Sequence, residues 1–345
     1  MVCLERLLRI ALPPKQSAFL RGPRKTGKST FLQTAFPDSL RYDLLQTDVM
    51  IELAKRPSLL REQLLAIPAR RVEAPVIIDE VQKVPQLLDE VHHLIEDRGL
   101  RFILCGSSAR KLRRGRTNLL GGRAWRYEMR PLASPELPAL DLLRALNRGL
   151  VPAHYLGVEY RRSLDAYVRD CGVDAKTVKE YYQILVDTLL GTFVEPYQAR
   201  QGRQVITKAS KFYLFDVGVA GALTKRHLIE ERGEAFGRAL EHFVLMEILA
   251  HRSYRDLHYD VHFWRTKTGL EVAFILGRGE VAIEVKGANR LDPAAFRSLR
   301  AFADDHRPRR AIVVCNERSP RLHAGINVLP WREFLERLWQ GAIVS

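Results

Sequence analysis

The sequence predicts an α/β protein with an N-terminal phosphate-loop domain, a winged-helix middle and an α/β C-terminal domain. Three observations support this prediction. Residues 22–30 read GPRKTGKST, a complete G-x-x-x-x-G-K-[ST] loop between an apolar strand and a helix. Residues 76–80 form an apolar strand that ends in two acids, and residues 281–286 place a glutamate and a lysine on one face of a strand.

The phosphate loop has the residue types that binding a nucleoside triphosphate requires. Glycines at both ends let backbone amides point at phosphates, at the positive end of the following helix. Lys28 is expected to reach the β- and γ-phosphates, and Ser29 is expected to bind Mg²⁺. A chance match in a chain with 55 Lys and Arg is disfavoured by the flanking strand and helix signals. We expect ATP to contact Gly22, Pro23, Arg24, Lys25, Thr26, Gly27, Lys28, Ser29 and Thr30.

The two acids after the second apolar strand complete this pattern. A carboxylate at the carboxyl end of a strand beside a phosphate loop is where Mg²⁺ is held, which suits Asp79. Glu80 is then placed to polarise the attacking water. The alternative is an acid pair at a helix N-terminus after a core strand, and the upstream loop argues against it.

A third strand and a basic segment supply further candidates. Residues 101–105 run into Ser107 and Ser108, either of which is a candidate sensor of the γ-phosphate. An arginine of the 110–123 region, with Arg110 and Arg123 as candidates, is expected to act as an arginine finger on a neighbouring subunit. A solvated basic loop, or a structural ion pair for Arg123, is the alternative.

The bulk composition limits the protein class. The 345 residues, 46% of them hydrophobic and 28% charged, suffice for two or three domains with their own cores. The net charge of +15 favours an anionic partner, of which nucleic acid is the first candidate. Four cysteines without C-x-x-C spacing indicate no zinc site, and no apolar run approaches 18 residues. We therefore expect a cytoplasmic protein without a membrane partner.

Several segments together resemble one protein family. In order along the chain they are the phosphate loop, VIIDEVQ (76–82), GSSAR (106–110), LGGRA (120–124), AHYL (153–156), KFYLFDVG (211–218), FWRT (263–266) and IEVK (283–286). Over nearly the whole chain, this set resembles the AAA-like ATPases that carry a C-terminal DUF4143 domain. The resemblance implies an AAA-type fold, ATP hydrolysis and a nuclease-like C-terminal domain.

The expected domains are an ATPase domain (1–135), a linker or lid (136–160), a winged-helix-like domain (161–228) and a nuclease-like domain (229–345). In the third, residues 173–185 resemble the second helix of a helix-turn-helix, and a strand at 193–197 and a second at 204–206 form a wing. The alternative for this domain is a spacer between proteins. The expected DNA contacts are Lys176, Thr177, Lys179, Arg200, Arg203 and Lys208, with Lys211 close to the wing.

The C-terminal domain resembles the PD-(D/E)XK nucleases but lacks one part. Glu284 and Lys286 share a strand face, and Glu241 is the helix acid of the pattern. The family reads E-V-D-F where this chain has Glu271-Val272-Ala273-Phe274, so the expected metal-binding aspartate is an alanine. We therefore expect a nuclease fold used for binding or assembly. If Ala273→Asp creates metal-dependent nicking that Lys286→Ala abolishes, the domain is a nuclease silenced at one position.

Three functions remain open at this stage. The first is an ATP-driven motor, assembled as a hexameric ring, that remodels or translocates duplex or branched DNA, with Holliday-junction branch migration as one form. The second is an ATP-dependent nuclease, against which Ala273 counts. The third is a nucleotide-gated switch that binds protein partners.

Overall fold

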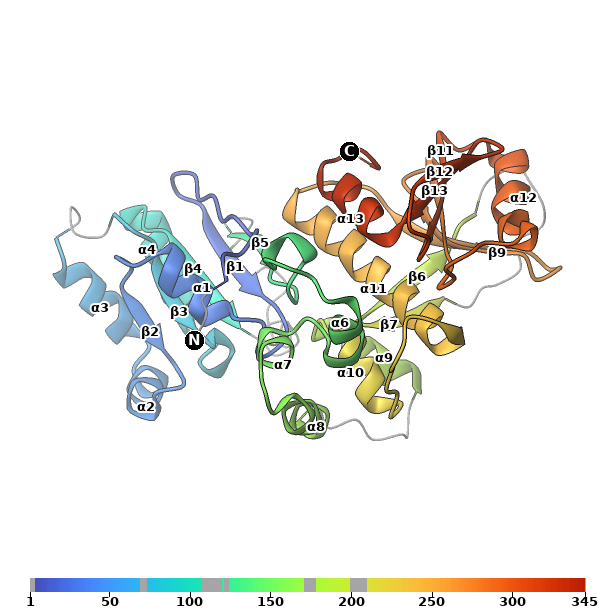
Figure 1. Ribbon diagram of the computed structural model, residues 1–345. Coiled ribbons are helices and arrows are strands. Elements are labelled where there is room, and N and C mark those ends of the chain that lie inside the picture. Colours follow the sequence, from blue (N-terminus) through green and yellow to red (C-terminus); the bar gives the residue numbers. More distant parts are fainter. Residues whose placement is uncertain are drawn as a thin grey trace. The chain divides into compact units, whose positions relative to one another are not determined.

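The computed structural model describes residues 4–68, 73–106, 120, 124–170, 178–198 and 210–344 (Figure 1). The chain forms two compact units that are not consecutive in sequence. The N-terminal unit comprises Leu8–Arg130 and Lys176–Leu190, and the C-terminal unit comprises Met1–Leu7, Pro131–Ala175 and Gly191–Ser345. Each unit has its own sheet.

The N-terminal unit is built on a five-stranded parallel sheet in the order β2-β3-β4-β1-β5. Its strands are β1 (Ser17–Arg21), β2 (Arg41–Asp43), β3 (Val76–Asp79), β4 (Phe102–Gly106) and β5 (Ala124–Glu128). Its helices are α1 (Lys28–Ala35), α2 (Thr47–Lys55), α3 (Ser58–Ala66), the 3-10 turn η2 (Val81–Lys83), α4 (Leu87–Arg98) and α9 (Val178–Asp187). The α/β class and the parallel sheet agree with the sequence prediction.

The core of this unit follows the two-residue period of its strands. Val76 and Ile78 of β3, together with Phe102 and Leu104 of β4, point to one face and pack against α2, α3 and α4. Both faces of a parallel sheet are covered, and β3 accordingly reads as a continuous apolar run up to Asp79. The polar residues therefore come where the strands end.

The C-terminal unit contains an eight-stranded mixed sheet in the order β12-β13-β11-β10-β9-β8-β6-β7. Its strands are β6 (Gly191–Pro196), β7 (Lys211–Leu214), β8 (Val261–Arg265), β9 (Glu271–Leu276), β10 (Val281–Val285), β11 (Arg310–Cys315), β12 (Arg321–His323) and β13 (Ile326–Pro330). Its helices and 3-10 turns are η4 (Ser134–Glu136), α6 (Leu142–Arg148), α7 (Pro152–Tyr155), α8 (Tyr160–Asp170), α10 (Val217–Leu223), α11 (Gly233–Tyr254), η5 (Pro293–Phe296), α12 (Arg297–His306) and α13 (Trp331–Trp339).

Helices cover both faces of this second sheet, as Figure 1 shows. Along β11, Ile312 and Val314 pack toward α11 and α13, while Ala311 and Val313 pack toward α12. Leu240 and Phe243 of α11 are fully buried on the first face. None of the described helices combines the length and the apolar composition that a membrane crossing needs.

The middle of the chain differs from its predicted arrangement. The stretch expected as a linker contains α6 and α7, and Leu142, Leu146 and Tyr155 are buried in the C-terminal core. The strand expected in a separate wing is β6, which pairs with both β7 and β8 of the second sheet. The second wing strand, residues 204–206, lies outside the described residues. β6 lies in the larger sheet because its pairing with β8 buries part of it.

A buried carboxylate joins segments of the C-terminal unit that are distant in sequence. Asp216 is the N-cap of α10 and accepts hydrogen bonds from the amides of Gly218 and Val219, both at 2.9 Å, and from Leu150 at 2.6 Å. Gly149 has φ 76°, and a Cβ there would lie 1.8 Å from Asp216 Oδ1. Only glycine fits beside this cap.

One acid, Glu136, holds the first described residues of the chain in place. Residues 4–10 are not helical in the structure. Instead, the Arg6 guanidinium donates to Glu136 Oε1 at 2.9 Å, and the Leu7 amide donates to the same oxygen at 2.7 Å. Arg6 also donates to the hydroxyl of Tyr254 at the end of α11.

The buried carboxyl group of Glu247, on α11, should make the stability of the protein depend on pH. It accepts from the Ser134 amide and hydroxyl and from Trp339 Nε1, but burial raises its pKa from the usual 4.5 to about 7. The folded state therefore holds this proton more tightly than the unfolded chain, so stability falls as pH rises through that window. Between pH 5 and pH 8 this effect should lower the free energy of unfolding by on the order of 2 kcal/mol. We expect Glu247→Gln to remove that loss.

Urea unfolding of both proteins at the two pH values measures this difference. Buried His242 and His251, whose pKa values burial lowers to about 4, act with the opposite sign in both chains and cancel in the comparison. Equal pH dependence in the two proteins would show that Glu247 keeps its charge in the folded state.

Candidate nucleotide-binding site

The phosphate loop connects β1 to α1 with the backbone conformation that glycine permits. Gly27 immediately precedes α1 and has φ 91°, in the left-handed region. A Cβ at Gly22 would lie 2.3 Å from the carbonyl oxygen of Met129, so a side chain there would push the loop away from the strand beside it. Both glycines of the motif are thus required by local geometry.

The loop is held together by its own side chains. Lys28 is 7% exposed, and its Nζ donates to the carbonyl oxygens of Gly22 and Pro23, each at 2.9 Å. The hydroxyl of buried Thr26 donates to Pro23 at 2.9 Å. Burial lowers the pKa of Lys28, although the carboxylates of Asp79 and Glu80 act against that shift. The ammonium group therefore lies within the curve of the loop.

Ser29 and Asp79 meet at the edge of the sheet. The Ser29 hydroxyl donates to Asp79 Oδ2 at 2.7 Å across 50 residues of sequence. β4 lies between β1 and β3 in the sheet, and it ends in buried Cys105 and Gly106. A hydroxyl oxygen next to a carboxylate is a donor pair that suits Mg²⁺, which prefers oxygen ligands from one or two side chains plus phosphate.

Glu80 has an unusual backbone and a close side-chain partner. Its φ of 55° is left-handed, which is uncommon for a residue with a Cβ. Gln82 Nε2 donates to Glu80 Oε2 in a very close contact, and the Glu80 amide donates to Asp79 Oδ1 at 3.0 Å. Gln82 also packs against Gly106, where a Cβ would lie 2.2 Å from Gln82 Oε1. Gln82 is not among the site residues predicted from the sequence, although its place two residues after Glu80 was the available signal.

The structure thus brings Lys28 and Ser29, at the start of α1, together with Asp79 at the end of β3 and with Glu80 just after it. The other candidates for this site are outside the described residues, namely Ser107, Ser108, Arg110 and Arg123. In the described part of the chain, no group of three or more His, Cys, Asp or Glu side chains is placed to hold a metal ion. A magnesium site here would depend on Ser29, Asp79 and the phosphates themselves.

The family comparisons agree with this geometry. A family model described as an AAA domain matches residues 14–137, which include β1, the loop, β3 and β4. A second model, described as a domain of unknown function, DUF4143, matches residues 236–334. The chain is an AAA-domain protein with a C-terminal DUF4143 domain. A third model, a domain of unknown function named DUF8612, matches residues 157–228 between them. A search of curated proteins found no match.

The AAA and DUF4143 assignments confirm the family expected from the sequence motifs. The AAA domain supports a nucleotide-binding, ATP-driven activity. The DUF8612 match covers the segment expected as a winged helix, and its description assigns no function. Of the expected DNA contacts, Lys176, Thr177, Arg200, Arg203 and Lys208 lie outside the described residues, while Lys179 lies on α9.

The acidic residues of the C-terminal unit also come together. Glu241 on α11 and Glu271 on β9 both contact the ammonium of Lys211 on β7. Glu284 on β10 pairs with Lys286 Nζ at 2.7 Å. Lys211, expected near a DNA-binding wing, is thus paired with two carboxylates, because β7 lies in the sheet of this unit.

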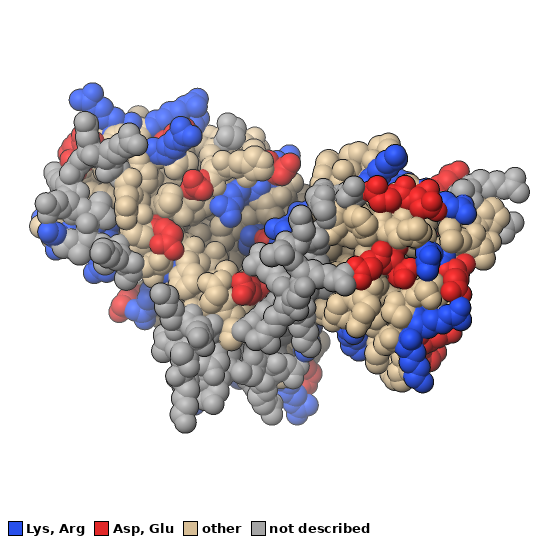
Figure 2. Space-filling view, turned by 180° about the vertical axis from the view of Figure 1, so that it is seen from behind, with Lys and Arg blue, Asp and Glu red and all other residues tan. Residues whose placement is uncertain are grey.

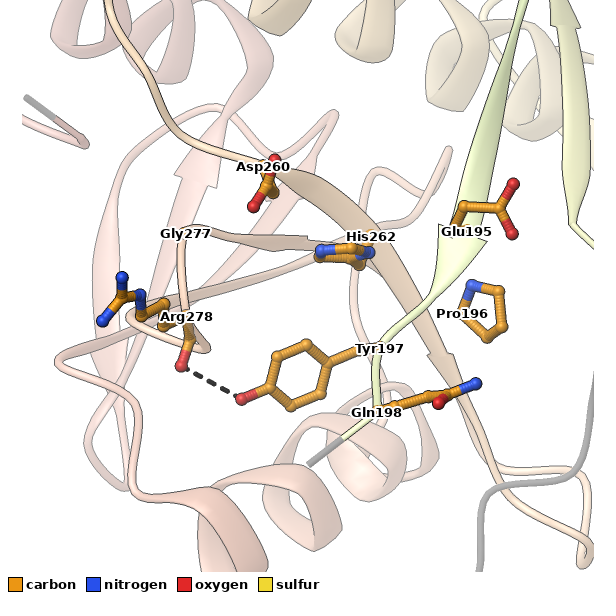
Figure 3. A pocket seen from close by; sticks show the side chains of 8 residues that line it. All are labelled: Glu195, Pro196, Tyr197, Gln198, Asp260, His262, Gly277 and Arg278. Carbon is orange, nitrogen blue, oxygen red and sulfur yellow. Dashed lines mark hydrogen bonds between the residues drawn. The ribbon is translucent and has the colours of Figure 1, made fainter. Parts of the chain in front are cut away.

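A pocket of about 570 Å³ lies elsewhere in the C-terminal unit (Figure 3). The Tyr197 hydroxyl donates to the carbonyl of Arg278 at 3.0 Å, and its ring lies 6.0 Å from that of His262. Glu195 and Asp260 supply negative charge and Arg278 supplies positive charge. This mixture selects no single class of ligand.

The described surface charge does not form one continuous basic area on the face in Figure 2. Lys and Arg side chains lie there in separate groups, with Asp and Glu beside several of them. The net charge of +15 therefore describes the whole chain, and this face alone identifies no nucleic-acid interface.

Proposed function

We propose that the protein is an ATP-hydrolysing AAA-type motor that binds DNA and remodels or translocates duplex or branched DNA. Branch migration of Holliday junctions is one form of this activity. The observation that carries the ATP-driven part is the 2.7 Å contact between Ser29 and Asp79 next to buried Lys28. A hydroxyl, a carboxylate and an ammonium group arranged in this way support the binding of a triphosphate and its Mg²⁺.

Each residue has a separate task in this proposal. The amides of the loop bind the phosphates at the N-terminus of α1, and Lys28 neutralises charge on the β- and γ-phosphates. Ser29 and Asp79 hold Mg²⁺, whose charge adds to that of Lys28. Glu80 orients the attacking water and accepts its proton. Gln82, which contacts Glu80, positions that carboxylate.

The DNA part of the proposal is supported by charge. A net charge of +15 favours a polyanion, and the attraction acts over the length of a duplex. In the same proposal the subunits assemble as a hexameric ring, and the DUF4143 domain serves DNA binding or assembly. Ala273, in the place of a metal-binding carboxylate, argues against a nuclease.

One alternative is a nucleotide-gated switch that binds protein partners. ATPase rates with and without single-stranded, duplex and four-way-junction DNA separate the two functions. A motor should hydrolyse ATP steadily and faster with its preferred DNA. Turnover that no DNA changes, in a preparation that binds no DNA at low salt, would contradict the motor and favour the switch.

An arginine finger predicts that the ATPase site is shared between subunits. We expect activity per subunit to rise with protein concentration, because an arginine from the 110–123 region reaches the neighbour's γ-phosphate. Mixing Arg123→Ala with Lys28→Ala protein should partly restore turnover, since a mixed interface can contain one intact loop and one intact arginine. Activity strictly proportional to concentration in a species shown to be monomeric would contradict this prediction.

A further inference from the structure

A lysine lies among the acidic residues of the DUF4143 domain. Lys211 begins β7, and its Nζ makes a very close contact with Glu271 Oε1 and lies 3.5 Å from Glu241 Oε1. Tyr213, two residues later on the same strand, donates its hydroxyl to Glu241 Oε1 at 2.5 Å. Because side chains on a strand alternate, these two donors share one face and both reach Glu241.

A third carboxylate adjoins this group. Glu284 on β10 is 6% exposed and accepts from the Ala273 amide at 3.2 Å and from Lys286 at 2.7 Å. Burial raises the pKa of Glu284, and the charge of nearby Glu241 raises it further. Glu284 and Glu241 are therefore close enough to repel each other in a partly buried site, and Glu271 shares Lys211 with Glu241.

Such a group of carboxylates requires positive charge, which a divalent metal or an ammonium group can supply. Lys211 supplies it from within the chain. Although burial lowers its pKa, Glu241 and Glu271 outweigh that effect and the pKa is raised overall. Lys211 Nζ also lies 5.2 Å from the centre of the Phe263 ring, a cation–π contact that further fixes its place.

We propose that Lys211 is the resident cation between Glu241 and Glu271, beside Glu284 with its own partner Lys286, and that Lys211 and Ala273 together exclude a divalent metal from these carboxylates. The lysine neutralises the carboxylates that a metal would bind, and Ala273 removes one ligand. This inference concerns the DUF4143 domain and does not depend on ATP hydrolysis or DNA binding. It also bears on the Ala273→Asp test, since that substitution alone leaves the ammonium group in place.

Mn²⁺ binding by isothermal titration calorimetry tests the proposal in the full chain without nucleotide. An Asp79→Asn substitution in every protein removes the contribution of the nucleotide site. We expect no Mn²⁺ binding at this cluster in the otherwise unchanged chain, and weak binding or none in Ala273→Asp. The double variant Ala273→Asp with Lys211→Met should bind one Mn²⁺ about 10- to 100-fold more tightly than Ala273→Asp.

Lys211→Arg combined with Ala273→Asp is the matched control, because it keeps the charge and should still exclude Mn²⁺. Thermal unfolding provides a second measurement. Lys211→Met should lower the melting temperature, and Mn²⁺ should raise it again only in the double variant. The proposal fails if Ala273→Asp binds Mn²⁺ with an affinity that Lys211→Met does not change. It also fails if the folded double variant, checked by circular dichroism, binds none.

Discussion

Lys28→Ala is expected to abolish ATP binding or turnover, whereas Glu80→Gln is expected to keep binding and lose hydrolysis. Lys28 lies within the phosphate loop at 2.9 Å from two of its carbonyl oxygens, so its loss removes the positive charge that the phosphates need. Glutamine at position 80 keeps the size of the side chain but accepts a proton poorly. We expect the hydrolysis rate of Glu80→Gln to fall about 100-fold or more.

Nucleotide affinity and steady-state phosphate release measure the two effects separately. Lys55→Ala, which removes an exposed lysine from the end of α2 in the same unit, is the matched control and should leave both unchanged. Hydrolysis by Glu80→Gln at the parental rate would show that Glu80 is not the base. The role of the phosphate loop in ATP binding would then be tested by Lys28→Ala alone.

The affinity for DNA is expected to fall steeply with salt. If the basic chain contacts 6 to 10 phosphates, raising the salt from 50 to 200 mM should weaken binding about 10³-fold or more, linearly on logarithmic axes. Fluorescence anisotropy with a labelled duplex and a labelled four-way junction measures this slope. The slope reports how many counterions are released, and hence how many phosphates the protein contacts.

Lys28→Ala protein is the control for this experiment, because it should bind DNA with the same salt slope while lacking turnover. Removing Arg200 and Arg203 together should reduce the slope by about two if both contact phosphates. An affinity that does not respond to salt would contradict an electrostatic interface, and no binding of any DNA at low salt would contradict the DNA part of the proposal.

The sequence signals for the nucleotide site are local. Gly22, Gly27, Lys28 and Ser29 lie in one loop whose spacing is set by backbone geometry, and Asp79 ends an apolar strand. The parallel sheet then brings the carboxyl ends of β1 and β3 to one edge. Pattern and topology together were enough to place these residues near one another.

The C-terminal unit shows what a pattern cannot supply. Lys211 lies 30 residues from Glu241 and 60 from Glu271, and no periodicity links them. The sequence suggested a wing for this region because two strand-like segments, 193–197 and 204–206, flank the basic residues Arg200 and Arg203. The pairing of β6 with β8, which decides its true place, depends on a strand more than 60 residues later.

The contacts of Arg6 have a consequence for the order in which the protein can fold during synthesis. Its partners, Glu136 and Tyr254, are made about 130 and 248 residues later. The stretch Leu8–Arg130, which makes up most of the N-terminal unit and its core, is synthesised between Arg6 and Glu136. The AAA domain can therefore fold before α11 leaves the ribosome, whereas Arg6 can contact Tyr254 only afterwards. Shortening the chain at its start should consequently weaken the unit that is synthesised last.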